Sequence, residues 1–208
     1  CEIFGLVDPT VTGSANLCGG TLTYTWEFTD DCGRTTTHIQ NVTVEPADSP
    51  TFIDPPANRT ITCSEVPTGP GAPLFYSNNA GGACMQLGFV SPFTFGDVDE
   101  CGGSITNIWT LTDDCGEVFT HTQILTVLPA PDPVFINLPT DGSLSCSSDF
   151  SGPPELEYTN GETGDCEIAG TVVATVTTIS PTEEQYDWSF TSPCTGEVIT
   201  YSQTVTLD

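Results

Sequence analysis

Ten cysteines are the residues whose type and spacing could support chemistry in this chain, and most of them recur at a fixed interval. The positions of Cys18 and Cys101 differ by 101 − 18 = 83. The same interval separates three further pairs: Cys32 and Cys115, Cys63 and Cys146, and Cys1 and Cys84. The segment CGGTLTYTWEFTDDCG, which begins at residue 18, returns as CGGSITNIWTLTDDCG at residue 101. Such periodicity indicates an array of structural repeats.

A third copy follows at a slightly shorter interval. The positions of Cys84 and Cys166 differ by 166 − 84 = 82. Each Trp stands six residues before a cysteine, at Trp26, Trp109 and Trp188. We therefore expect three repeats with a period of about 83 residues. Residues 1–49 form the C-terminal half of one repeat, residues 50–131 a complete repeat, and residues 132–208 a third, divergent repeat.

These cysteines could form disulfides or bind zinc. The CxxC and HxxxH spacings that tetrahedral zinc sites favour are absent. Ten cysteines in register within 208 residues are instead typical of a disulfide framework, which forms outside the reducing cytosol. The sequence therefore predicts an extracellular protein.

Chain geometry predicts which cysteines pair. A strand of ten residues spans roughly 30 Å, whereas the Cα atoms of a disulfide lie within about 7 Å. Cys101 and Cys115, at opposite ends of one strand, therefore cannot pair. We expect four disulfides, all within repeats: Cys84–Cys115, Cys63–Cys101, Cys1–Cys32 and Cys166–Cys194. Pairing of Cys63 with Cys84 is the alternative.

Cys18 and Cys146 have no partner in this scheme. The partner of Cys18 is expected upstream of residue 1, and the third repeat reads PTEEQ where the partner of Cys146 would stand. One interpretation is a partial chain with a degenerate repeat. The other is that these two cysteines form intermolecular disulfides in a polymer.

Histidines and nucleophiles give no sign of catalysis. His38 and His121 occupy the same repeat position, where the third repeat has Tyr201. A catalytic residue is not expected to recur and then change in this way, so we interpret all three as strand side chains. No Ser or Cys stands in a nucleophile motif. The sequence predicts that the protein is not an enzyme.

Acidic loops are the remaining candidates for chemistry. Calcium takes six to eight oxygen ligands, and two loops offer carboxylates: Asp97, Asp99, Glu100, Asp113 and Asp114. The EF-hand pattern is absent, and Asp in a turn often accepts hydrogen bonds from the backbone instead. We expect no cofactor, with calcium at these loops as the alternative.

The charge excludes several classes of partner. The chain carries 28 acidic and 2 basic residues, a net charge of −26. Phosphate binding depends on Lys and Arg, so we expect no nucleic acid partner. Anionic membranes also repel acidic proteins. No apolar run of ~18 residues is present, and we expect no direct membrane insertion.

Alternating residues predict the fold. From Thr21 to Thr29, apolar side chains alternate with Thr and Glu, as in a half-buried antiparallel strand. The TDDCG turn and a second strand from Thr35 to Val44 complete a hairpin. No segment shows sustained helical periodicity. We predict an all-β chain of tandem immunoglobulin-like β-sandwich repeats, joined by stiff, Pro-rich junctions.

Two sequons add candidate glycosylation sites. Asn41 begins NVT and Asn58 begins NRT, and either could accept an N-linked glycan.

The stretch CGGTLTYTWEFTDDCGRTTTHIQNVTV resembles the tandem repeats of very large surface proteins in Bacteroidota, including gliding-motility adhesin filaments, and more distantly hyalin-type repeats. The third repeat departs from this pattern by losing CGG. The resemblance implies secreted, immunoglobulin-like repeats that are exported by the type IX route and act in adhesion or motility.

The expected function is a structural segment of an extracellular bacterial surface filament or adhesin, a rigid stalk for adhesion or gliding motility. Its partners are neighbouring repeats or copies of itself, with surface glycans or proteins as further candidates. The alternative is a non-catalytic glycan- or protein-binding module. Phe89 and Phe93 are the nearest candidates for an exposed aromatic site, although core packing is the simpler explanation for both.

Overall fold

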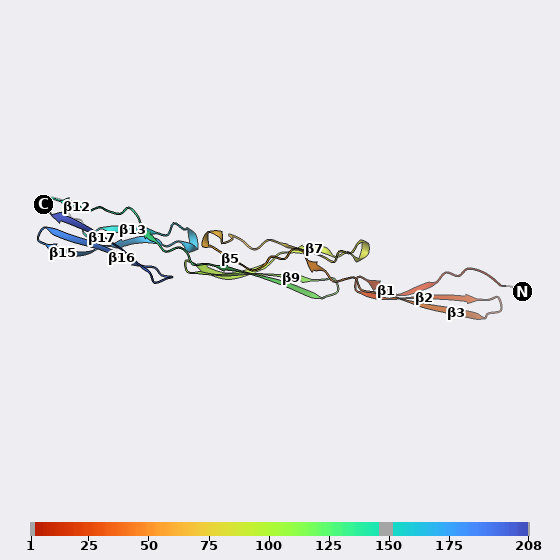
Figure 1. Cartoon of the computed structure of the whole chain (residues 1–208). Coiled ribbons are helices and arrows are strands. Elements are labelled where there is room, and N and C mark those ends of the chain that lie inside the picture. The colour runs from red at the N-terminus through yellow and green to blue at the C-terminus, as the bar shows by residue number, and fades with distance from the viewer. Residues whose placement is uncertain (1–2, 146–151, 208) are drawn as a thin grey trace. The chain divides into compact units, whose positions relative to one another are not determined.

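The computed structural model describes residues 3–145 and 152–207, which consist largely of β-strands (Figure 1). These ranges contain 17 strands, three short 3₁₀-helices and no α-helix. None of the helices described there is long and apolar enough to cross a bilayer. The predicted all-β fold is confirmed.

The first repeat contributes one antiparallel sheet. Its strands, in spatial order, are β1 (Thr10–Asn16), β2 (Gly19–Thr29) and β3 (Thr35–Val44). The central strand β2 pairs with β1 on one side and with β3 on the other. The hairpin predicted from the TDDCG turn is therefore present.

The second repeat contributes seven strands in two sheets. One sheet has the order β4 (Thr51–Phe52), β6 (Leu74–Ser77), β7 (Leu87–Val90). The other has the order β5 (Arg59–Ile61), β10 (Val118–Val127), β9 (Gly102–Thr112), β8 (Phe93–Asp99). Two 3₁₀-helices, η1 (Cys63–Glu65) and η2 (Gly82–Cys84), lie in the connections.

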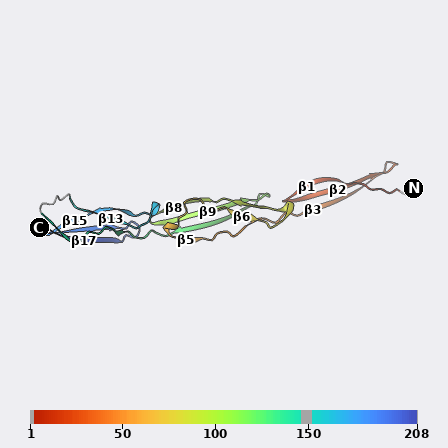
Figure 2. The ribbon, with the colours of Figure 1, turned by 90° about the horizontal axis from the view of Figure 1, so that it is seen from above.

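The third repeat has the same plan. One sheet has the order β11 (Val134–Phe135), β13 (Glu155–Thr159), β14 (Ala169–Val173). The other has the order β12 (Gly142–Leu144), β17 (Val198–Leu207), β16 (Glu183–Thr191), β15 (Thr175–Ser180). The 3₁₀-helix η3 (Gly164–Cys166) precedes β14. Figure 2 shows β13, β15 and β17 gathered near the C-terminus.

Contacts divide the chain into two compact units that do not coincide with the repeats. Unit 1 comprises Cys1–Pro56, Gly71–Phe93 and Ile108–Thr122. Unit 2 comprises Ala57–Pro70, Thr94–Asn107 and Gln123–Asp208. Each unit thus combines parts of two successive repeats, and the repeat boundaries at residues 49 and 131 stay a prediction.

The two sheets of the third repeat enclose a common core. Trp188 and Tyr186 of β16 are buried together with Leu156 of β13 and Val205 of β17. Phe135 of β11 packs against the same cluster. Because side chains from both sheets share one interior, this repeat is a β-sandwich, immunoglobulin-like in its two packed sheets.

The recurring Trp fixes this core by a polar contact as well as by its volume. The Trp188 indole N–H donates to the carbonyl of Pro154 at 3.1 Å. In the second repeat the Trp109 indole N–H donates to the carbonyl of Ala72 at 3.0 Å. A buried indole needs such a partner, which explains why the Trp position recurs with the cysteines.

The histidine position is also structural in the second and third repeats. His121 Nε2 donates to the carbonyl of Pro56 at 2.9 Å. In the third repeat the Tyr201 hydroxyl donates to the carbonyl of Pro139, the matching proline. His and Tyr exchange at this position because each supplies one donor to the same backbone group.

The second glycine of each CGG motif is required by a close backbone approach. Gly103 has φ 152°, and a Cβ there would lie 2.2 Å from the carbonyl oxygen of Asp97. Gly20 has φ 148°, and a Cβ would lie 2.2 Å from the carbonyl oxygen of Ser14. In the third repeat a tight turn at Pro181 and Thr182 joins β15 to β16 and replaces this motif.

Replacing Trp188 with Ala should lower the free energy of unfolding by about 3–5 kcal/mol, because the change removes a buried aromatic side chain and leaves a cavity. The matching change at half-buried Trp26 should cost clearly less. Urea denaturation followed by circular dichroism measures both. Equal losses at the two positions would contradict this account of the core.

Candidate functional site: disulfides that join repeats

The described residues form three disulfides, and each joins two different repeats. Cys18 bonds Cys115, with their Cα atoms 5.4 Å apart and a sequence separation of 97. The other two are Cys63–Cys166, with a separation of 103, and Cys101–Cys194, with a separation of 93. All three separations exceed the repeat length, so the covalent crosslinks run from one repeat to the next.

The predicted pairing within repeats is therefore wrong. Three expected partners are exchanged: Cys115 bonds Cys18 instead of Cys84, Cys101 bonds Cys194 instead of Cys63, and Cys166 bonds Cys63 instead of Cys194. Cys32 and Cys84 are exposed free thiols, so the alternative Cys63–Cys84 bond is not formed either. The expected Cys1–Cys32 bond involves a residue that the structure does not describe. Cys1 and Cys146 lie outside the described residues.

Distance does exclude a bond between Cys101 and Cys115, as predicted. These two cysteines stand at opposite ends of β9 and do not pair. Each instead bonds a cysteine of an adjacent repeat, so neither has its partner within the second repeat. Because Cys18 bonds Cys115, it is not available for the intermolecular bond that the sequence suggested.

The turn that carries Cys115 is held by an aspartate. Asp113 Oδ1 accepts hydrogen bonds from the N–H of Cys115 at 2.9 Å and from the N–H of Glu117 at 2.8 Å. The Gly116 N–H donates to the Asp113 carbonyl at 3.0 Å. The backbone around the sulfur is thus fixed by contacts other than the disulfide.

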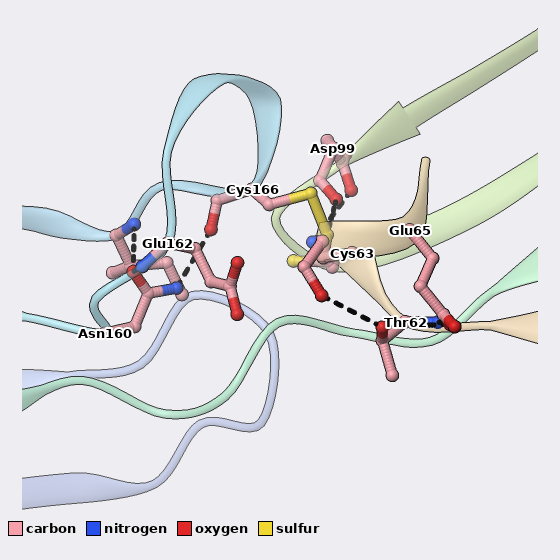
Figure 3. Close-up of a disulfide and its surroundings, with 10 residues drawn as sticks. Thr62, Cys63, Glu65, Asp99, Asn160, Glu162 and Cys166 are labelled. Atoms are coloured by element: carbon pink, nitrogen blue, oxygen red, sulfur yellow. Dashed lines mark hydrogen bonds between the residues drawn. A yellow bond between two sulfur atoms is a disulfide. The ribbon is translucent and has the colours of Figure 1, made fainter. Parts of the chain in front are cut away.

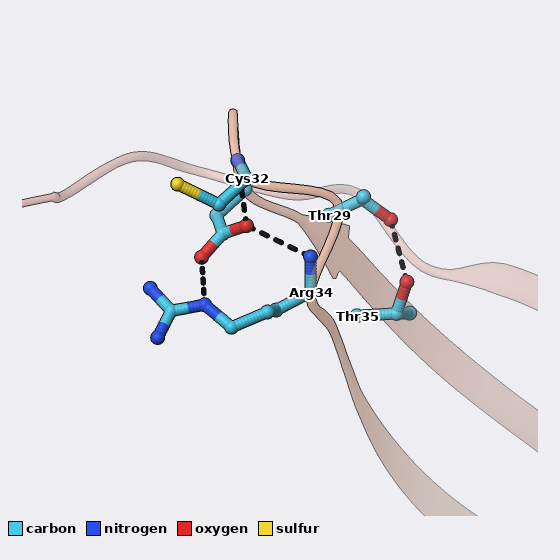
Figure 4. A network of polar contacts seen from close by, with 5 residues as sticks. Thr29, Cys32, Arg34 and Thr35 are labelled. Atoms are coloured by element: carbon cyan, nitrogen blue, oxygen red, sulfur yellow. Dashed lines mark hydrogen bonds and ion pairs between the residues drawn. The ribbon is translucent and has the colours of Figure 1, made fainter.

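The first repeat has the same turn with an unbonded cysteine (Figure 4). Asp30 Oδ1 accepts from the N–H of Cys32 at 3.0 Å and from the N–H of Arg34 at 2.8 Å. Asp30 also forms an ion pair with Arg34 Nε at 2.7 Å. The Arg34 N–H, with smaller contributions from its guanidinium and the Cys32 N–H, lowers the pKa of the Asp30 carboxyl.

An asparagine holds the cysteine of the third 3₁₀-helix (Figure 3). The Asn160 side-chain amide donates to the carbonyl of Cys166 at 2.9 Å, and Asn160 Oδ1 accepts from the N–H of Ile168 at 3.1 Å. Cys166 is thereby presented to Cys63. This asparagine was not among the predicted site residues, although Asn78 and Asn160 stand in the same repeat register as Cys84 and Cys166.

The Cys63–Cys166 disulfide lies in a buried cluster within unit 2. Cys63 and Cys166 pack with the buried side chains of Ile61, Leu125 and Ile168. On the Cys63 side, Glu65 accepts from the N–H of Thr62 at 2.8 Å and closes the helix N-terminus (Figure 3). This bond is therefore shielded from solvent by apolar side chains.

A cavity of about 440 Å³ adjoins the same disulfide. Its lining includes Val66, Pro67 and Val98, together with the acidic residues Glu162 and Asp165. No basic side chain lines it, so the cavity offers no charge complementarity to an anion.

The acidic residues predicted as calcium ligands lie in two places. Asp97, Asp99 and Glu100 stand at the end of β8, where Asp99 Oδ1 accepts from the N–H of Cys101 at 2.9 Å. Asp113 and Asp114 belong to the turn described above. Within residues 3–145 and 152–207, no group of three or more His, Cys, Asp or Glu side chains could hold a metal ion. Calcium binding stays a prediction.

Both sequons are exposed. Asn41 lies on β3 and accepts a hydrogen bond from the Thr23 hydroxyl at 2.8 Å. Asn58 lies just before β5, and its Oδ1 accepts from the N–H of Ile124 at 2.8 Å. Glycosylation at either residue stays a prediction.

The aromatic candidates are not in the core. Phe89 is 63% exposed and Phe93 is 70% exposed, so the expectation of core packing is wrong. Phe75 of β6 is 57% exposed and lies beside Phe89, with ring centroids 6.0 Å apart. The β6–β7 hairpin thus presents an aromatic surface.

No family model and no curated protein matches the chain. Among solved structures, the protocadherin GammaB4 extracellular domain is similar at a TM-score of 0.32 and 10% identity. The match covers 98% of this chain and 44% of that one.

Mass spectrometry of the non-reduced protein should recover three crosslinked peptide pairs, Cys18–Cys115, Cys63–Cys166 and Cys101–Cys194. An endoprotease that cleaves at acidic residues suits this chain, because it has only two sites for trypsin. Cys32 and Cys84 should react with iodoacetamide before reduction. Recovery of Cys84–Cys115 or Cys63–Cys101 would contradict the pairing.

Proposed function

We propose that this chain is a structural segment of an extracellular bacterial surface filament or adhesin, in which covalently joined repeats form a stalk that transmits tension in adhesion or gliding motility. The disulfides support a location outside the reducing cytosol. The resemblance of the CGG and TWEFTDDCG segments to surface-adhesin repeats supports the bacterial surface.

The observation that carries this proposal is the covalent route through the central strands. Cys18 immediately precedes β2, and its disulfide leads to Cys115, just after β9. Cys101 immediately precedes β9, and its disulfide leads to Cys194, just after β16. The three central strands are therefore linked in series by sulfur, independently of the connecting loops.

This connectivity limits extension. Between Cys18 and Cys194, the shortest covalent route follows the backbone only along β9, from Cys115 to Cys101. All other residues between Cys18 and Cys194 lie outside that route. Tension applied at the chain ends thus acts on β9 and two disulfides even after every sheet has opened. A protein whose task is to resist stretching benefits from this arrangement, whereas a catalyst does not need it.

The surface composition agrees with such a task. A net charge of −26 keeps neighbouring molecules apart in solution. The exposed positions of β3 are mainly Thr and other polar residues, which suit a solvated strand.

Single-molecule stretching tests the proposal. Full unfolding of the oxidised chain should release far less length than unfolding of the reduced chain, with a difference on the order of 500 Å at 3.3–3.6 Å per residue. A Cys101→Ser variant should give an intermediate length, because the shortest route then follows the backbone from Cys18 to Cys63, crosses the Cys63–Cys166 disulfide and continues to Cys194. Equal lengths for oxidised and reduced chains would refute a tension-bearing role. Antibody labelling of intact cells tests the surface location separately.

A second function, binding of a glycan or protein, is favoured by one observation. The exposed pair Phe75 and Phe89 has polar counterparts in the third repeat, Glu157 and Thr171, on the matching strands β13 and β14. An apolar surface present in one repeat and absent from another is typical of a contact site.

A Phe89→Thr variant, which installs the residue of the third repeat, tests this second function. Its free energy of unfolding should change by no more than about 0.5 kcal/mol, because the side chain is largely exposed. If the hairpin binds a ligand, retention on glycan arrays or on cells should fall sharply. Unchanged retention would exclude a role for Phe89, and Thr171→Phe serves as the reverse control.

A further inference from the structure

Two cysteines are unbonded although their counterparts in other repeats form disulfides. Cys84 is an exposed thiol, whereas Cys166, its counterpart in the third repeat, bonds Cys63. Cys32 is also an exposed thiol, whereas Cys115 bonds the cysteine of a CGG motif. The repeat register therefore indicates a partner for each free thiol. For Cys84 it is a cysteine at the position of Cys63, and for Cys32 it is the cysteine of a CGG motif.

Cys84 is held in the same way as its bonded counterpart. The Asn78 side-chain amide donates to the carbonyl of Cys84 at 2.7 Å, and Asn78 Oδ1 accepts from the N–H of Gln86 at 2.9 Å. Gly82 takes φ 62°, close to the 68° of Gly164 in η3. The asparagine hydrogen bonds that position Cys166 for Cys63 are thus also formed around Cys84, although Cys84 has no disulfide partner.

The first repeat is open where the third repeat is closed. Trp26 of β2 is only half-buried, whereas its counterpart Trp188 is 1% exposed beneath the β11-β13-β14 sheet. The described residues of the first repeat include no such second sheet. The face of β2 that carries Trp26 lacks the cover that its counterpart has.

Residues 4–7 correspond in sequence to a strand of such a second sheet but do not form one. Residues 4–7 match β7 in the repeat register, with Gly5 at the position of Gly88. They form no strand, and Phe4 is 92% exposed and Leu6 fully exposed. In the second repeat β7 is held by hydrogen bonding to β6, so residues 4–7 lack the strand that would order them.

We propose that Cys84, the Trp26 face of β2 and residues 4–7 together form a docking site for one further copy of the first half of the repeat. The docking segment is of the type of residues 50–83, and its cysteine at the position of Cys63 bonds Cys84. Its equivalent of β6 pairs with residues 4–7, and its backbone covers Trp26. The existing Cys18–Cys115 bond is then one of two disulfides at this junction, as in the pair Cys63–Cys166 and Cys101–Cys194.

The crosslink forms by thiol–disulfide exchange. Oxidised glutathione first exchanges with the incoming cysteine, which yields a mixed disulfide and one glutathione thiol. The Cys84 thiolate then attacks the cysteine sulfur of that mixed disulfide. The protein S–S bond forms, the bond to glutathione breaks, and a second glutathione leaves and takes up a proton. The two electrons lost by the protein thiols reduce one oxidised glutathione to two thiols.

The test extends the full chain by a copy of residues 50–83 placed directly before Cys1, which preserves the register because Cys1 matches Cys84. After refolding in a glutathione buffer, we expect loss of Cys84 alkylation and a crosslinked peptide that joins Cys84 to the added Cys63 copy. Trp26 should become protected from acrylamide quenching, measured in a Trp109→Phe, Trp188→Phe background if that variant folds, and otherwise by hydrogen exchange at residues 4–7.

Two controls separate docking from simple thiol reactivity. The same extension with its cysteine changed to Ser should still protect Trp26 and residues 4–7 but leave Cys84 free. An extension of scrambled sequence that retains the cysteine should do neither. Bonding of the added cysteine to Cys32 as readily as to Cys84, or an unprotected Trp26 in the intact extension, would overturn the proposal. The site would exist in any array of these repeats, so its failure leaves the surface-filament function untouched.

Discussion

The interaction on which this structure depends is the disulfide between successive repeats. Each repeat is small, and a chain of this size cannot bury enough apolar surface in several separate cores to be strongly stable. The second and third repeats share a buried cluster around Cys63–Cys166, in which the covalent bond holds side chains from both repeats together, such as Ile61 and Ile168. The compact units therefore cut across the sequence repeats.

Local polar contacts prepare the sulfurs for this role. Asp113 fixes the turn of Cys115, and Asn160 fixes the backbone of Cys166. Neither contact requires the disulfide, because Asp30 and Asn78 make the same hydrogen bonds around the free thiols of Cys32 and Cys84. The backbone geometry around each cysteine is therefore encoded within its own repeat, and oxidation then joins the repeats.

Much of the fold could be predicted from the sequence, and the disulfide pairing could not. The alternation in Thr21–Thr29 and the TDDCG turn identify a hairpin from local chemistry alone. The pairing depends on which repeat ends meet, which is a property of the assembled chain and leaves no mark on spacing. Phe89 is a second example. Its apolar side chain favours a position in the core, and only the assembled sandwich shows that it lies on the surface. Asn160 could have been found, since it recurs in register with the cysteine that it holds.

The loops closed by the three disulfides overlap, and this affects how the chain withstands proteolysis outside the cell. Every peptide bond from Cys18 to Cys194 lies inside at least one closed loop. A protease that cleaves the chain once anywhere in that stretch, including the Pro-rich connections, leaves both fragments attached to each other through sulfur. After two cuts the N-terminal and C-terminal fragments are still joined, directly or through the fragment between them, so their separation takes at least three cuts in that stretch or a reductant.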